Sequence, residues 1–153
     1  DLTNRRFGKT AARKVVLAGF ALAVMLSIWL ATPRIAIASG SAFLVAQFLD
    51  TQIFDRLRND AWWKPPLVST VIGSVVDTIL FFSLAFAASF AFLDTGLGME
   101  DGSLGFAVPF FGTEVPLWVS LAFGDFCVKM LVGLVMLAPY GALLSVLKPA
   151  PAR

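Results

Sequence analysis

Four long runs of apolar residues alternate with shorter polar segments along this chain. They extend approximately from Val15 to Ala31, Arg34 to Phe54, Leu67 to Phe92 and Leu117 to Leu137. A helix needs about 20 largely apolar residues to cross the hydrocarbon core of a bilayer, and each run is long enough or nearly so. The pattern therefore predicts an all-α, polytopic transmembrane bundle, with four spans in one integral membrane domain over residues 1–153.

Prolines and polar segments mark the ends of these predicted helices. Only two residues, the second of them Pro33, separate the first two runs, so we expect a tight helical hairpin there. The fourth helix should end at Pro139 and leave a short amphipathic tail through Leu147. Residues 93–116 are rich in glycine and carry four acidic residues, which is typical of an external loop.

The composition supports membrane insertion and argues against cofactor chemistry. Hydrophobic residues make up 58% of the chain, with 15 Phe and 4 Trp, and the mean hydropathy of +0.83 is far above that of soluble domains. A single cysteine, Cys127, excludes an intrachain disulfide, and without any histidine a zinc or haem site is hard to build. We therefore expect no cofactor and no metal site.

The basic residues predict how the chain is oriented. Five Lys and Arg fall between Arg5 and Lys14, three fall between Arg56 and Lys64, one stands at the first turn (Arg34), and none lies in 93–116. Cytoplasmic loops carry the excess of Lys and Arg. We therefore expect both visible ends of the chain to be cytoplasmic and residues 93–116 to face outward. The basic residues form no nucleic-acid-binding face.

Polar and aromatic side chains recur at spacings of three or four residues in three of the spans, so each set shares one helix face. The second span carries Ser39, Phe43, Gln47, Asp50 and Phe54; the third carries Thr70, Ser74, Asp77 and Phe81; the fourth carries Trp118, Ala122, Asp125 and Lys129. Three such faces can meet in one polar cavity.

The charged residues inside the spans are the strongest functional signal. An ionised side chain at a helix centre costs roughly 2.5 to 3.5 kcal/mol on insertion scales, so a chain that keeps one usually uses it. Asp77 has no partner within its own helix; it is matched by Lys129 across the bundle, or protonated, or free for a ligand. Asp125 and Lys129 have the favourable i,i+4 order, and a purely structural pair is as good an interpretation as a functional one.

Other residue patterns argue against enzyme classes. The chain contains no G-x-x-x-x-G-K-[ST] phosphate loop, so it is not itself the ATPase of a pump. Without histidine the usual nucleophile pairs are absent, and Asp77 with Asp125 lacks the sequence context of an intramembrane aspartyl protease. Transport is the better class. The alternative is a membrane scaffold or assembly factor, whose aspartates would be paired off with no polar cavity between the helices, and whose Ser and Thr serve as interhelical contacts.

A resemblance to a known family runs through nearly the whole chain. The residues that carry it are Asp1-Leu2-Thr3, Phe7-Gly8, Arg34-Ile35-Ala36, Gln47, Leu49-Asp50, Phe54, Arg56-Leu57-Arg58, Trp62-Trp63, Ser69-Thr70, Gly73, Asp77-Thr78, Phe81-Phe82, Asp125, Lys129, Pro139 and Gly141. In this order they resemble the bacterial queuosine precursor transporters, within the vitamin uptake transporter group.

The resemblance implies an importer of the bacterial inner membrane for 7-cyano-7-deazaguanine, and for its 7-aminomethyl relative, which are salvaged for tRNA modification. Members are similar in having six spans, with the Asp-Leu-Thr motif after the second. Either this sequence is therefore part of a longer protein, or its four helices assemble with other copies as a homo-oligomer. Transport of another purine-like or vitamin solute is the alternative within the same class.

A guanine-like base suggests roles for individual side chains. Its ring N–H and exocyclic NH₂ suit a carboxylate, Asp77 or Asp50, and its carbonyl and ring nitrogen suit Gln47. Phe43, Phe81 or Phe82 can stack on the flat base. The expected site is completed by Ser69, Thr70, Thr78, Asp125 and Lys129. Facilitated diffusion, proton coupling and membership of a larger ATP-driven assembly all remain open as energy sources.

Overall fold

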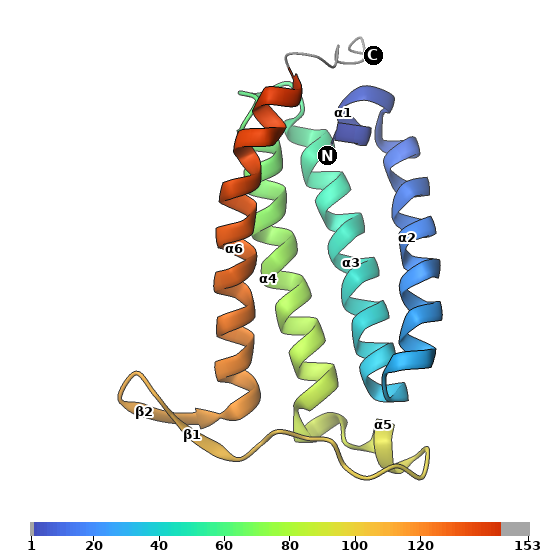
Figure 1. Ribbon diagram of the computed structural model, residues 1–153, viewed down its shortest axis with the longest axis vertical. Coiled ribbons are helices and arrows are strands. Elements are labelled where there is room, and N and C mark those ends of the chain that lie inside the picture. The colour runs from blue at the N-terminus through green and yellow to red at the C-terminus, as the bar shows by residue number, and fades with distance from the viewer. Residues whose placement is uncertain (1, 145–153) are drawn as a thin grey trace.

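Four long helices dominate the computed structural model of the chain, which describes residues 2–144. They are α2 (Lys9–Leu30), α3 (Pro33–Leu57), α4 (Lys64–Phe86) and α6 (Leu117–Leu144), and they stand side by side in Figure 1. A short helix, α1 (Leu2–Phe7), precedes them. The predicted helical bundle is confirmed.

Three of the described helices are long and apolar enough to cross a membrane: Lys9–Ser27 in α2, Lys64–Phe86 and Leu117–Leu144. Helix α3 has 25 residues but is less apolar, because Gln47, Asp50 and other polar side chains interrupt it. It is nevertheless flanked by two of the three, since it packs against both α2 and α4. The polar helix therefore lies between two of the apolar ones.

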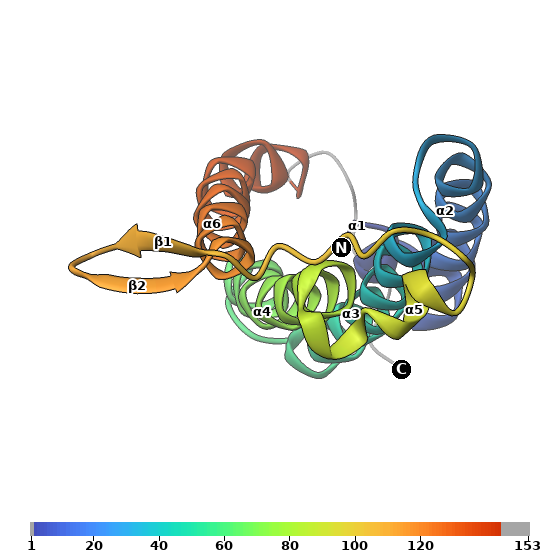
Figure 2. The same ribbon diagram turned by 90° about the horizontal axis from the view of Figure 1, so that it is seen from below.

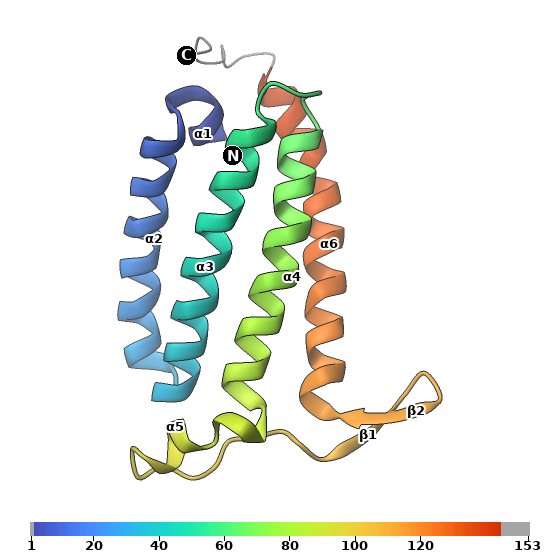
Figure 3. The same cartoon turned by 180° about the vertical axis from the view of Figure 1, so that it is seen from behind.

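The helices form an open arc. Helix α4 packs on α3 and on α6, and α3 packs on α2, so the spatial order is α2, α3, α4, α6. Seen from below in Figure 2, α2 and α6 project to the same side of the α3–α4 pair. The view from behind in Figure 3 shows the same order. The arc has a concave face toward which α3 and α4 can present polar side chains.

The hairpin between α2 and α3 forms where the sequence predicts it. Thr32 caps α3, and its Oγ1 accepts a hydrogen bond from the Ile35 backbone N–H at 3.4 Å. Pro33 occupies the first turn, where its missing N–H has no helical partner to lose. Helix α2 begins at Lys9, earlier than the predicted Val15, because charged side chains at a helix end do not interrupt helical geometry.

Two predicted helix ends are wrong. Helix α4 ends at Phe86 and not at Phe92: Ala87 is extended, and the 3₁₀ turn Ala88–Phe90 and helix α5 (Phe92–Thr95) follow. Helix α6 continues through Pro139 to Leu144, because a proline deep in an apolar helix can lose a backbone hydrogen bond without ending it. The predicted tail through Leu147 extends beyond the described residues.

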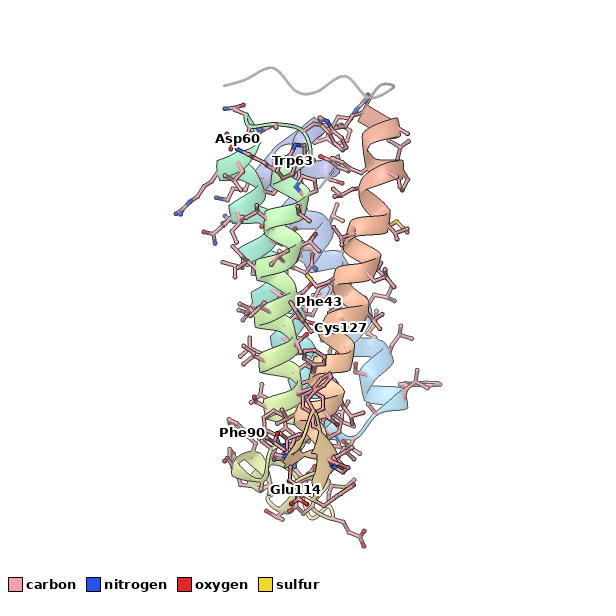
Figure 4. The ribbon with its side chains drawn as sticks, turned by 90° about the vertical axis from the view of Figure 1, so that its left-hand side faces the viewer. Phe43, Asp60, Trp63, Phe90, Glu114 and Cys127 are labelled. Atoms are coloured by element: carbon pink, nitrogen blue, oxygen red, sulfur yellow. The ribbon has the colours of Figure 1, made fainter. Side chains whose placement is uncertain are left out.

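The predicted external loop contains a β-hairpin, a small departure from the all-α prediction. Strands β1 (Ala107–Phe110) and β2 (Thr113–Pro116) pair antiparallel around Phe111 and Gly112, whose φ angles of 45° and 87° fit the mirror-image turns of tight hairpins. Figure 4 places Glu114 and Phe90 at one end of the molecule and Asp60 and Trp63 at the other. The acidic loop and the basic loop therefore lie at opposite ends, as the charge pattern predicts.

Arg34 holds the segment that follows α4, residues 87–103, against the helices. Its side chain is only 1% exposed; Nε donates to the Leu84 carbonyl at 2.8 Å, and Nη2 donates to the Ala87 carbonyl at 2.6 Å. Its Nη1 pairs with Asp94 at 2.8 Å and donates to Ser103 Oγ at 3.1 Å. The sequence suggested only an orientation marker here, whereas the structure shows a buried anchor that binds the end of α4.

Candidate functional site

A polar cavity of about 450 Å³ lies between α3, α4 and α6. Its lining residues are Phe43, Ala46, Gln47 and Asp50 from α3, Thr70, Gly73, Ser74 and Asp77 from α4, and Lys129 from α6. Figure 4 shows Phe43 well inside the length of the bundle, away from both ends. The three polar helix faces predicted from the spacing therefore do converge on one cavity.

Lys129 joins the acidic residues of α4 and α6. Its Nζ donates to Asp77 Oδ2 at 2.6 Å, to Asp125 Oδ2, and to Thr78 Oγ1 at 3.2 Å. Thr78 in turn donates its hydroxyl to Asp125 Oδ2 at 2.8 Å. The sequence left three alternatives for Asp77: a pair with Lys129, protonation, or a free carboxylate. The structure shows the pair with Lys129, which lies on a different helix. One ammonium facing two carboxylates leaves this cluster with an excess of negative charge when all three are ionised.

Asp50 is the second carboxylate of the cavity and lies on the opposite wall, on α3. The fully buried Ser69 on α4 interacts with it through a hydrogen bond. Among the described residues, the ion pairs of the cavity use Asp77 and Asp125 but not Asp50. Gly73 of α4 lies next to Asp50, since a Cβ at this position would be in ordinary van der Waals contact with Asp50 Cβ, 3.8 Å away. Within residues 2–144, Asp50 is therefore the carboxylate of the cavity that forms no ion pair with a Lys or Arg side chain.

Four of the predicted site residues do not line the cavity. Thr78 and Asp125 lie behind Lys129, and Ser69 lies behind Asp50. Phe81 packs edge-on against Phe82, with ring centroids 5.1 Å apart. Phe43 is accordingly the aromatic ring that the cavity itself presents.

Three residues line the cavity although they were not in the predicted site: Ala46, Ser74 and Gly73, which was interpreted as a close-packing point. Ser74 belongs to the polar face of the third predicted span and was interpreted mainly as an interhelical contact. Ala46 carries no polar signal, but it precedes Asp50 by four residues and so lies on the same helix face. The helical spacing was therefore sufficient to find Ser74 and Ala46.

The cavity offers hydrogen-bond acceptors, an amide, hydroxyls, an ammonium and an aromatic ring. Within residues 2–144, no group of three or more His, Cys, Asp or Glu side chains is arranged to hold a metal ion. Apolar helices around a charged cavity define a multi-pass membrane protein with a polar cavity between its helices.

Comparison with known proteins identifies the family. The pattern of the family described as "Putative vitamin uptake transporter" matches residues 25–143. The chain is 32% identical over 169 aligned residues to the "Probable queuosine precursor transporter" of Haemophilus influenzae and, again at 32% over 169 residues, to the "Queuosine precursor transporter" of Escherichia coli. The chain therefore belongs to the vitamin uptake transporter family, a family of transporters and not of enzymes.

The two relatives are longer than this chain. Each alignment covers 96% of the chain, but only 63% of the Haemophilus protein and 67% of the Escherichia protein. No solved structure matches the chain.

Proposed function

We propose that this protein imports the queuosine precursor 7-cyano-7-deazaguanine, and its 7-aminomethyl relative, across the bacterial inner membrane. Both ends of the chain then face the cytoplasm and residues 93–116 face outward. The observation that carries the proposal is the cavity itself, which brings Asp50, Gln47 and Phe43 from one helix to the same space as Asp77 and Lys129. The names of the two relatives support the same solute.

The lining residues suit a deazaguanine chemically. The base presents a ring N–H beside an exocyclic NH₂, and one carboxylate accepts both in a bidentate arrangement. Asp77 on α4 and Asp50 on the α3 wall are the two candidates for this role, while Gln47 can both donate to the base carbonyl and accept from the base. Phe43 can stack on the ring, a contact worth roughly 1 to 3 kcal/mol per base. Thr70 and Ser74 add hydroxyls on the α4 wall.

The scaffold alternative predicts paired aspartates and no polar cavity. The pairing of Asp77 and Asp125 with Lys129 agrees with it, but the cavity of about 450 Å³ does not. A scaffold also has no use for Asp50, a carboxylate that lines the cavity without a cationic partner among the described residues. These two observations favour transport.

Uptake into vesicles tests the proposal. Proteoliposomes that contain the purified protein should accumulate or equilibrate labelled 7-cyano-7-deazaguanine faster than protein-free vesicles, and excess unlabelled guanine should compete poorly. Uptake at the protein-free rate by correctly inserted protein would overturn the proposal. Repeating the assay with an imposed pH gradient separates two energy sources, since uptake indifferent to the gradient rules out proton coupling.

A further inference from the structure

The Lys129 cluster has one side that faces the cavity and one side that does not. Lys129 and Asp77 line the cavity, whereas Asp125 and Thr78 lie behind them. All of them meet at Lys129 Nζ, which donates to Asp77, Asp125 and Thr78. An ammonium has three donors, so these contacts use its full capacity.

We propose that Lys129 is a displaceable internal partner of Asp77, and that Asp125 and Thr78 are positioning residues that hold the ammonium when the substrate takes its place. The inference rests on the proposed function, because it needs a substrate whose N–H donors bind Asp77. In the structure Lys129 donates to an Asp77 oxygen that the substrate would also require. Substrate binding then exchanges one donor for another on the same carboxylate.

The geometry makes this exchange favourable. An ammonium that lost Asp77 without another anion would be left uncompensated in the membrane interior, which is strongly unfavourable. Asp125 lies one turn before Lys129 on the same helix and is already in contact with it. A lysine has a flexible four-carbon stem, so its ammonium can turn from Asp77 toward Asp125 without moving the helix. Thr78 contacts both the ammonium and the carboxylate toward which it turns, since it accepts from Lys129 and donates to Asp125.

The charged groups that face Lys129 come from each wall of the site. Asp77 faces it from α4, Asp125 lies on its own helix, and Asp50 lines the α3 wall of the same cavity. Asp125 differs from the two others in not lining the cavity. Its effect on the substrate must therefore pass through Lys129. An experiment can measure this as a dependence of the Asp125 effect on the presence of Lys129.

A double-mutant cycle tests the inference. The affinity for 7-cyano-7-deazaguanine is measured for the wild-type protein, Asp125→Asn, Lys129→Gln and the double variant. Without the Asp125 charge, Lys129 remains on Asp77, so Asp125→Asn should weaken binding about tenfold, the usual weight of one charged hydrogen bond. In the Lys129→Gln background, the ammonium that connects Asp125 to Asp77 is absent. Asp125→Asn should then change the affinity less than about twofold, because residues that share no partner do not couple.

Three further variants keep the test independent of folding defects. Thr78→Val removes the shared hydroxyl and should weaken binding, whereas Thr78→Ser keeps the hydroxyl and should bind as the wild type does. Cys127→Ser is the matched control, since Cys127 lies between Asp125 and Lys129 in sequence but is exposed on α6. Its affinity should be unchanged.

The outcomes are distinguishable. An equal loss of affinity from Asp125→Asn in both Lys129 backgrounds would overturn the inference, because Asp125 would then act on the substrate or on the fold directly. An absence of any loss would overturn it too. Either result leaves the proposed function intact if the wild-type protein binds 7-cyano-7-deazaguanine and Asp77→Asn does not. A folded wild-type protein that does not bind overturns both.

Discussion

Arg34 and Asp94 are separated by 60 positions in the sequence and form a buried ion pair, with 2.8 Å between Arg34 Nη1 and Asp94 Oδ2. The two side chains are 1% and 5% exposed. The pair joins the first turn of α3 to the short helix α5, and the remaining guanidinium donors reach the carbonyls at the end of α4. The Arg34 side chain therefore connects the start of α3 with α5 and with the end of α4.

Arg34→Ala should destabilise the protein strongly. The substitution leaves the Asp94 carboxylate buried without its cation, and breaking a buried pair from one side typically costs about 3 to 5 kcal/mol. We expect a fall of several degrees in the midpoint of thermal unfolding, and only partial recovery in Arg34→Lys, because an ammonium cannot reproduce the planar fork. Arg56→Ala is the control, an exposed arginine near the other end of α3. Equal midpoints for Arg34→Ala and Arg56→Ala would contradict this account of the anchor.

Asp101 should make the stability of the protein depend on pH in the acidic range. Hydrogen bonds from the Ser103 side chain and backbone, together with the nearby Arg34 charge, lower the pKa of Asp101. A carboxyl group with a lowered folded-state pKa contributes stability that is fully present above its unfolded pKa, about 3.9, and lost as the pH falls through the folded value.

The stability difference between wild type and Asp101→Asn should therefore be constant from neutral pH to about pH 5 and shrink below about pH 4. Thermal unfolding in detergent over this pH range measures it. A difference that grew on acidification would have the wrong sign for a lowered pKa.

Gly133 should be sensitive to the addition of a single methyl group. A Cβ at this position would lie 2.9 Å from Thr70 Cγ2, so α6 or the Thr70 side chain must shift. Because Thr70 lines the cavity, Gly133→Ala should lower both the unfolding midpoint and the affinity for the proposed solute, 7-cyano-7-deazaguanine. Thr70→Ser removes the clashing methyl and should restore the midpoint in the double variant. Gly124→Ala is the control on the same helix, since nothing lies within 4 Å of its added Cβ. An equal fall in midpoint and affinity for Gly124→Ala would show that any glycine substitution in α6 has this effect, and not the contact with Thr70.

Asn4 should hold α1 against α3. Its side chain is 1% exposed, and Nδ2 donates to the Thr51 carbonyl at 3.0 Å. Asn4→Ala should release this contact at a cost of about 1 to 2 kcal/mol, the usual range for a buried hydrogen bond. Hydrogen exchange of the α1 amides should then accelerate, while that of α4 stays unchanged. Thr10→Ala, at an exposed position of α2, should leave α1 protected; unchanged exchange in Asn4→Ala would show that other contacts hold α1.

The faces of the helices could be predicted because helical spacing is a local property. Gln47, Asp50 and Phe43 share one face at intervals of three and four residues, whatever surrounds them, and all of them line the cavity. How the helices are rotated against one another is not local. The sequence therefore left open whether Asp77 meets Lys129, and it did not reveal that Phe81 packs on Phe82 instead of lining the cavity.

The segment that follows α4 was harder to predict for a different reason. Hydropathy continues past Phe86, so the apolar run gave no sign that the helix ends there. At the break, the Ala87 carbonyl accepts a hydrogen bond from the Arg34 guanidinium, which comes from a distant part of the chain. Counting basic residues assigns Arg34 to a loop and cannot show that it is buried, because burial depends on the acceptors that the fold assembles around it.

The central claim is that the cavity between α3, α4 and α6 binds a deazaguanine base through its carboxylates. The most direct measurement is calorimetric titration of the purified protein in detergent with 7-cyano-7-deazaguanine, with guanine as the comparison and Asp77→Asn as the variant. We predict selective binding by the wild-type protein and a loss of at least about tenfold in Asp77→Asn, as expected for removal of a charged hydrogen-bond acceptor. Equal affinity in the two proteins, or no binding by a well-folded wild-type sample, would contradict the claim.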